Sequence, residues 1–150
     1  MSIILLTTKI AAPRSTCFDI ARSIDVHLSS MIHTKERAIA GRTSGLCELN
    51  DTITWEAVHF GIKQNLTVKI SKMESPHYFE DVMVKGAFKS IQHRHTFEEN
   101  NGVTSMKDIF KYETPYGIFG KLFDVLVLKK YMTNLLLERN RVIQQVSESA

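Results

Sequence analysis

The sequence predicts one α+β domain in which a curved antiparallel sheet of six or seven strands encloses a long C-terminal helix. From Glu36 to Pro115, apolar and polar residues alternate and turn residues recur, a pattern typical of consecutive antiparallel strands. After Pro115, apolar residues recur at intervals of three, four or seven, as on one face of a helix. That stripe is buried only if the sheet bends around it, which is a helix-grip arrangement.

The turn residues predict the order of the elements. Ile3–Ile10 is expected to be a first strand, because it is rich in β-branched residues and leucine and is followed by Ala11-Ala12-Pro13. Two short helices follow, one capped by Ser15 or Thr16 and one through Val26 to Ile32. The remaining strands are expected at Arg37–Leu46, Thr52–Phe60, Ile62–Lys72, His77–Ala87, Ser90–Glu98 and Val103–Glu113.

The final helix is expected to bury one face against this sheet. Its predicted apolar stripe consists of Ile118, Leu122, Val125, Leu128, Met132, Leu135 and Val142. The break between the last two strands, Asn100-Asn101-Gly102, is a strong hairpin signal because Asn and Gly tolerate positive φ. The length of 150 residues suits a single domain over residues 1–150.

The composition disfavours several classes of partner. The formal net charge is only +3 and the basic residues are scattered, so no nucleic-acid partner is expected. Cys17 and Cys47 lie far apart without CxxC or His spacing, which indicates free thiols and a cytoplasmic location. No signal peptide is expected, and the run Val125–Leu128 is far shorter than the ~20 residues of a membrane span.

Strand alternation places four ionisable residues on the concave, largely apolar side of the sheet: Asp81, His93, His95 and Asp108. Buried charged groups require partners, so one interpretation is an internal hydrogen-bond network. A second is a set of polar groups that face a ligand. A third is a metal site on His93 and His95 with one aspartate, but a His-x-His pair on a strand is a weak signal, so no metal or cofactor is predicted.

The whole chain resembles the SRPBCC, or START-like and pollen-allergen-like, superfamily, and in particular its bacterial polyketide cyclase-like and ligand-binding members. The resemblance rests on four segments, Thr54–Gly61, Asp81–Phe88, His93–Phe97 and Asp108–Gly117. It implies a pocket between the sheet and the C-terminal helix. Members of the superfamily carry sterols, lipids, polyketides, quinones or plant hormones, and some catalyse cyclisations or dehydrations, so the fold alone does not choose the ligand.

We therefore expect a binding protein for a small, mostly hydrophobic or aromatic molecule. The alternative is a cyclase or dehydratase that uses His93 or His95 with Asp81 or Asp108 as acid and base. A third class is an interaction protein whose cavity is filled by its own side chains. The candidate ligand-binding residues are Trp55, His59, Asp81, Met83, Phe88, His93, His95, Asp108, Phe110, Tyr112 and Met132. The sequence indicates no oligomeric state.

Overall fold

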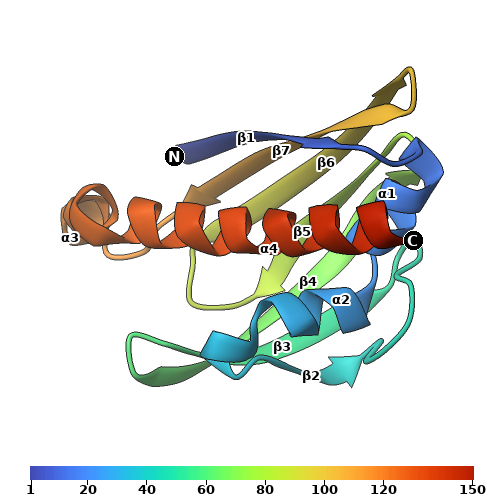
Figure 1. Cartoon of the computed structure of the whole chain (residues 1–150). Helices are drawn as coiled ribbons and strands as arrows, with labels where there is room; N and C mark the ends of the chain where they lie inside the picture. The colour runs from blue at the N-terminus through green and yellow to red at the C-terminus, as the bar shows by residue number, and fades with distance from the viewer.

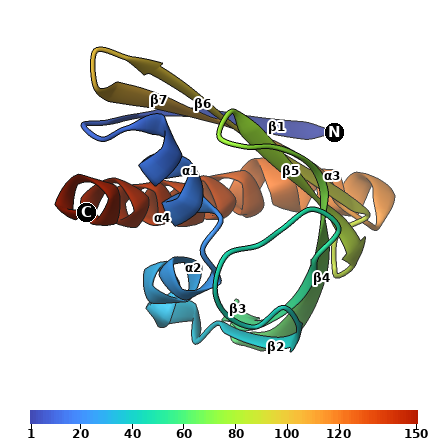
Figure 2. The same cartoon turned by 90° about the vertical axis from the view of Figure 1, so that its right-hand side faces the viewer.

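The structure is a computed structural model that describes residues 1–150. One antiparallel sheet contains all seven strands, in the order β1-β7-β6-β5-β4-β3-β2. The sheet curves around the long C-terminal helix, which crosses its concave side (Figures 1 and 2). The predicted α+β helix-grip fold is therefore confirmed. The strands are β1 (Ser2–Ile10), β2 (Arg37–Gly41), β3 (Thr52–His59), β4 (Ile62–Glu74), β5 (Tyr78–Lys85), β6 (Ser90–Asn100) and β7 (Val103–Glu113).

Two short hairpin turns set the register of the central strands. The turn Phe60-Gly61 joins β3 to β4, and Asn101-Gly102 joins β6 to β7; all four residues have positive φ. Two successive positive φ values match the right-handed twist of the flanking strands. The predicted Asn-Gly hairpin is therefore present, and it places His95 opposite Asp108 on the neighbouring strand.

The strand β2 is shorter than predicted, because it ends at Gly41 and not at Leu46. Gly41 has a φ of +72°, and a side chain there would collide with the carbonyl oxygen of Thr52. The chain therefore leaves the sheet, and Leu46 forms only an isolated bridge with Ser23. Cys47, which follows in this connection, is buried.

The short helices close one end of the sheet. Helix α1 (Arg14–Ala21) buries Cys17 and Phe18, and Phe18 packs edge-to-face against Phe79 and Phe97. Helix α2 (Ile24–Ser30) is capped by Ser23, whose hydroxyl accepts from the backbone N–H of Val26, and a 3-10 turn, η1 (Ile32–Thr34), follows it. None of the helices combines the length and the apolar character that crossing a bilayer requires.

The C-terminal helix runs without a break through three segments, α3 (Gly117–Phe123), a π-helical turn (Asp124–Leu128) and α4 (Lys129–Ser149). Figure 1 shows α3 at the end of α4 that is remote from the C-terminus. A side chain at Gly120 would collide with the carbonyl oxygen of Pro115, so only glycine lets α3 approach this loop so closely. The helix therefore starts at the edge of the concave face of the sheet and then continues across that face.

The apolar stripe was predicted correctly only for the second half of this helix. Leu128 and Leu135 are buried, whereas Ile118, Leu122 and Val125 are exposed. Between residues 117 and 128 only Gly120, Asp124 and Leu128 are buried, so α3 presents most of its apolar side chains to solvent. Near the C-terminus the buried apolar residue is Ile143, and Val142 is only partly buried.

Candidate ligand cavity

A cavity of about 710 Å³ lies between the concave face of the sheet and the C-terminal helix. Of its 38 lining residues, 24 are hydrophobic, so most of its wall offers no hydrogen bonds. This volume falls within the range of small-molecule sites. The cavity excludes the interpretation in which large side chains fill the interior of the grip.

The cavity opens at the end of the molecule where α3 lies. Its exposed lining residues come from the β3–β4 turn, the following part of β4, the β5–β6 connection, and α3 with the residue before it: Phe60, Asn65, Ala87, Tyr116, Phe119 and Phe123. Phe60 packs against Phe123 and Tyr131, with ring centroids 5.6 Å and 4.5 Å away. The opposite end is closed by buried residues, among them Ile24, Ile70 and Phe79. The opening is therefore largely aromatic.

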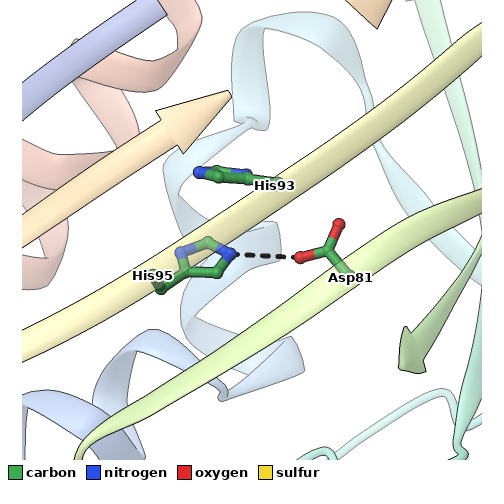
Figure 3. Close-up of side chains that lie close together, drawn as sticks. All are labelled: Asp81, His93 and His95. Carbon is green, nitrogen blue, oxygen red and sulfur yellow. Dashed lines mark hydrogen bonds and ion pairs between the residues drawn. The ribbon is translucent and has the colours of Figure 1, made fainter. Parts of the chain in front are cut away.

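Polar side chains gather at the closed end, where strands β5, β6 and β7 run side by side. His93 Nε2 lies 2.7 Å from Asp108 Oδ1, and His95 Nε2 lies 3.1 Å from Asp81 Oδ2. Both contacts are diagonal, because Asp81 is directly opposite His93 and His95 is directly opposite Asp108. Figure 3 shows the two imidazoles lying one above the other, with the Asp81 carboxylate reaching His95 from β5.

Helix α4 completes this cluster with two residues that the sequence analysis did not identify. Arg139 Nη2 donates to His95 Nδ1 at 3.3 Å, and its Nη1 lies 3.5 Å from Asp108 Oδ1. Asn140 Nδ2 donates to Asp108 Oδ2 at 2.7 Å. We name Asp81, His93, His95, Asp108, Arg139 and Asn140 the inner polar cluster. Arg139 occupies the stripe spacing that starts at Leu128 and Met132, and this spacing is the signal that could have identified it.

The surroundings favour ionised aspartates and neutral His93. Burial opposes ionisation of Asp81 and Asp108, but hydrogen bonds from the histidines outweigh it. The pKa of Asp81 is therefore below its ordinary value, and that of Asp108 is well below it. Burial, helped by neighbouring His95, lowers the pKa of His93 to about 4 despite the bond to Asp108. At neutral pH, His93 therefore donates through Nε2–H and keeps a lone pair on Nδ1.

The geometry of three of these residues also resembles that of a metal site. One ligand atom from each of Asp81, His93 and His95 lies within 4.8 Å of the others. However, both ring nitrogens of His95 already form hydrogen bonds, to Asp81 and to Arg139. A guanidinium group beside the site would also repel a divalent cation. This arrangement fits a hydrogen-bonded network better than a set of metal ligands.

The predicted site residues divide into two groups. Eight line the cavity: Trp55, His59, Asp81, Phe88, His93, His95, Phe110 and Met132. Met83, Asp108 and Tyr112 are not among the residues that line it. Tyr112 is fully buried and donates to Asp124, which also accepts from Ser2. Asp108 lies behind the histidines, where it holds their orientation, and Met83 packs with the apolar group beside Phe88.

His59 and Trp55 contact side chains of other elements, which the alternation of apolar and polar residues along β3 does not predict. His59 Nδ1 lies 2.7 Å from the hydroxyl of Tyr131 on α4. The ring of His27, on α2, lies 4.2 Å from that of Trp55, and His27 Nε2 is 2.8 Å from Glu36. These contacts join the sheet to the surrounding helices along the cavity wall.

The chain is similar in structure to several solved proteins. The protein TTHA0849 of Thermus thermophilus has a TM-score of 0.74 and 18% identity, covering 97% of this chain and 99% of that one. A START superfamily protein of Mycobacterium smegmatis has a TM-score of 0.73 and 13% identity over 98% and 97% of the two chains. The ginseng major latex-like protein 151 of Panax ginseng has a TM-score of 0.71 and 13% identity over 97% of each chain.

No family model matches the sequence, and no curated protein matches it significantly. The structural likeness nevertheless extends over almost the whole chain, so the fold is the START-like helix-grip fold that the sequence segments predicted. By its fold and its cavity, this chain is an α+β protein with an internal, mostly apolar pocket.

Proposed function

We propose that this protein binds a small, mostly hydrophobic molecule in the cavity, and that residues 1–150 act as one ligand-binding domain. The observation that carries the proposal is the cavity itself, about 710 Å³ of mainly apolar space that its own side chains leave open. Apolar walls with a few placed polar groups are typical of small-molecule sites. The START-like fold of the solved neighbours supports the same function.

The proposed site consists of apolar lining residues, which would contact most of the ligand, and polar lining residues, which would contact its polar group. Trp55, Phe88 and Phe110 supply flat apolar surface, and Met132 supplies an adaptable one from the helix side. Asp81, His93 and His95 supply polar atoms at the closed end. His59 contributes nearer to the opening, where it is held by Tyr131. Because the walls are largely apolar, we expect affinity to come mainly from buried apolar area.

The cyclase or dehydratase alternative is not favoured by the comparisons. We also propose a cytoplasmic location, because both cysteines are free and buried, as expected in a reducing compartment.

A pair of matched substitutions tests the proposed function. Ala57 is buried and lines the cavity, whereas Ala40 is exposed on β2. Ala57→Phe should reduce binding of a hydrophobic fluorescent probe by about ten-fold or more, because the new ring takes up ligand volume, and Ala40→Phe should leave it unchanged. Native mass spectrometry of protein taken directly from cells should show a bound small molecule that Ala57→Phe lacks. Equal probe affinity in the two folded variants would contradict the proposal.

A further inference from the structure

Two acceptor atoms at the closed end of the cavity have no partner in the protein. Asp81 uses Oδ2 to accept from His95, and no protein group donates to its Oδ1. His93 uses Nε2 to donate to Asp108, and its Nδ1 has no protein donor. Both side chains line the cavity, with 19% of the Asp81 side chain and 7% of the His93 side chain exposed. Both acceptors therefore belong to largely buried side chains that line the cavity.

The hydrogen bonds of the neighbouring donors run to other acceptors. Arg139 donates through Nη1 to Asn140 Oδ1 at 3.0 Å and through Nη2 to His95 and to the carbonyl oxygen of Ala21. Asn140 donates through Nδ2 to Asp108. His95 donates to Asp81 and accepts from Arg139, so neither of its nitrogens is free. None of these donors forms a hydrogen bond to Oδ1 of Asp81 or Nδ1 of His93.

We infer that the ligand carries a hydrogen-bond donor, a hydroxyl or a protonated amine, that binds between Asp81 Oδ1 and His93 Nδ1. This inference rests on the proposed function and names the polar group of that ligand. A hydroxyl hydrogen satisfies one of these acceptors, and the bond to Asp81 Oδ1 is the stronger because that oxygen is charged; a protonated amine can donate to both atoms. A ketone, ether or ester offers only acceptors there, and a carboxylate would meet the negative charge of Asp81.

Three naphthalene probes of similar size separate these cases. 2-Naphthol carries a donor, 2-methoxynaphthalene carries the same oxygen without a donor, and 2-naphthoate carries an anion. Each is titrated at pH 7 by displacement of a hydrophobic fluorescent probe. We expect naphthol to bind about ten-fold tighter than either of the others, the scale of one satisfied hydrogen bond to a charged group.

Substitutions then test which residues cause the preference for naphthol. Asp81→Leu should reduce the naphthol preference over methoxynaphthalene to within about two-fold, because it removes the charged acceptor, and His93→Leu should reduce the preference less. Lys107→Ala, on the solvent side of β7, serves as the control and should keep the full preference. If a leucine variant does not fold, the preference of the unmodified protein still decides the question.

The possible outcomes distinguish the two proposals. Equal binding of naphthol and methoxynaphthalene, or tightest binding of naphthoate, overturns the donor inference and leaves an apolar binding cavity. A preference that survives in folded Asp81→Leu and His93→Leu also overturns it. Absence of binding for all three probes, together with a probe signal that Ala57→Phe does not change, overturns the proposed function itself.

Discussion

His93 and Asp108 form a buried pair on adjacent strands, with 2.7 Å between Nε2 and Oδ1. The pair is surrounded by Asp81, His95 and Arg139, which together with Asp108 are the ionisable groups that face His93. Because the pKa of His93 is lowered to about 4 in the folded state, this imidazole stays neutral where an exposed one would take up a proton. The stability of the protein should therefore depend on pH.

We predict that the free energy of unfolding falls as the pH drops from about 6.5 towards 4. In that window the unfolded chain binds a proton at His93 that the native chain does not, so acid favours unfolding. Between pH 7 and pH 5 His93 alone should contribute about 2 kcal/mol to this loss. Urea unfolding at the two pH values measures it.

The variant His93→Gln tests this assignment, because a glutamine amide can still donate to Asp108 but does not titrate. The difference in unfolding free energy between pH 7 and pH 5 should shrink by about 2 kcal/mol. His77→Gln changes an exposed histidine and should keep the full pH dependence. An unchanged slope in His93→Gln would show that other groups cause the acid sensitivity.

The second prediction concerns the charge balance of the inner polar cluster. Asp108→Leu leaves Arg139 buried without its main counter-charge and should lower the unfolding free energy by about 3–5 kcal/mol. The double variant Asp108→Leu/Arg139→Met removes both charges and should recover most of that loss. Additive losses in this cycle, measured by urea unfolding, would mean that the two residues do not stabilise each other.

The third prediction compares two leucines on the same helix. Leu128 is 8% exposed and faces the sheet, whereas Leu122 is 57% exposed. Leu128→Asp should cost about 3 kcal/mol or more, because it buries an unpaired carboxylate, and Leu122→Asp should cost less than about 1 kcal/mol. Lys130→Ala should have little effect. Similar melting temperatures for both aspartate variants would contradict the burial seen here.

The fourth prediction concerns the two thiols. Burial raises the pKa of Cys47 to about 12 and also raises that of Cys17. Neither should react with a disulfide reagent at pH 8 in the native protein, and both should react after unfolding in urea. The intact mass should be the same with and without reductant. A native protein that consumes one equivalent of reagent would show that a thiol is accessible.

Much of the fold could be predicted because its signals are local. The alternation in His93, His95 and Phe97 places one face of β6 inward, and the Asn101-Gly102 turn fixes which residue of β7 each one meets. The position of Asp108 beside the histidines therefore follows from the sequence. The sequence does not predict that Asp108 lies behind the histidines. Strand alternation predicts which face of the sheet a side chain is on, but not how far the side chain lies below the cavity surface.

The helix residues were harder to predict, since helical periodicity does not say where along its length a helix meets the sheet. Ile118 and Leu122 have the spacing of a buried stripe, yet they lie beyond the part of the helix that the sheet covers. The sequence does not predict a buried Arg139, because a charged residue is expected at the surface. Its burial depends on acceptors from other elements, His95 and Asp108, which only the tertiary structure brings to it.

The opening and the inner polar cluster lie at opposite ends of one elongated space. Phe123 at the opening and Arg139 in the cluster are sixteen residues apart, which corresponds to roughly 24 Å along the helix axis. If the proposed ligand binds with its donor at the inner polar cluster, the rest of the molecule lies nearer to the aromatic residues of the opening, such as Phe119 and Phe123. The protein would then discriminate between ligands by the polar group that reaches the inner polar cluster, and not by the part of the ligand at the opening. Ligands of one series that differ only in the length of the part near the opening should bind with similar affinity until that part is longer than the cavity and projects into water.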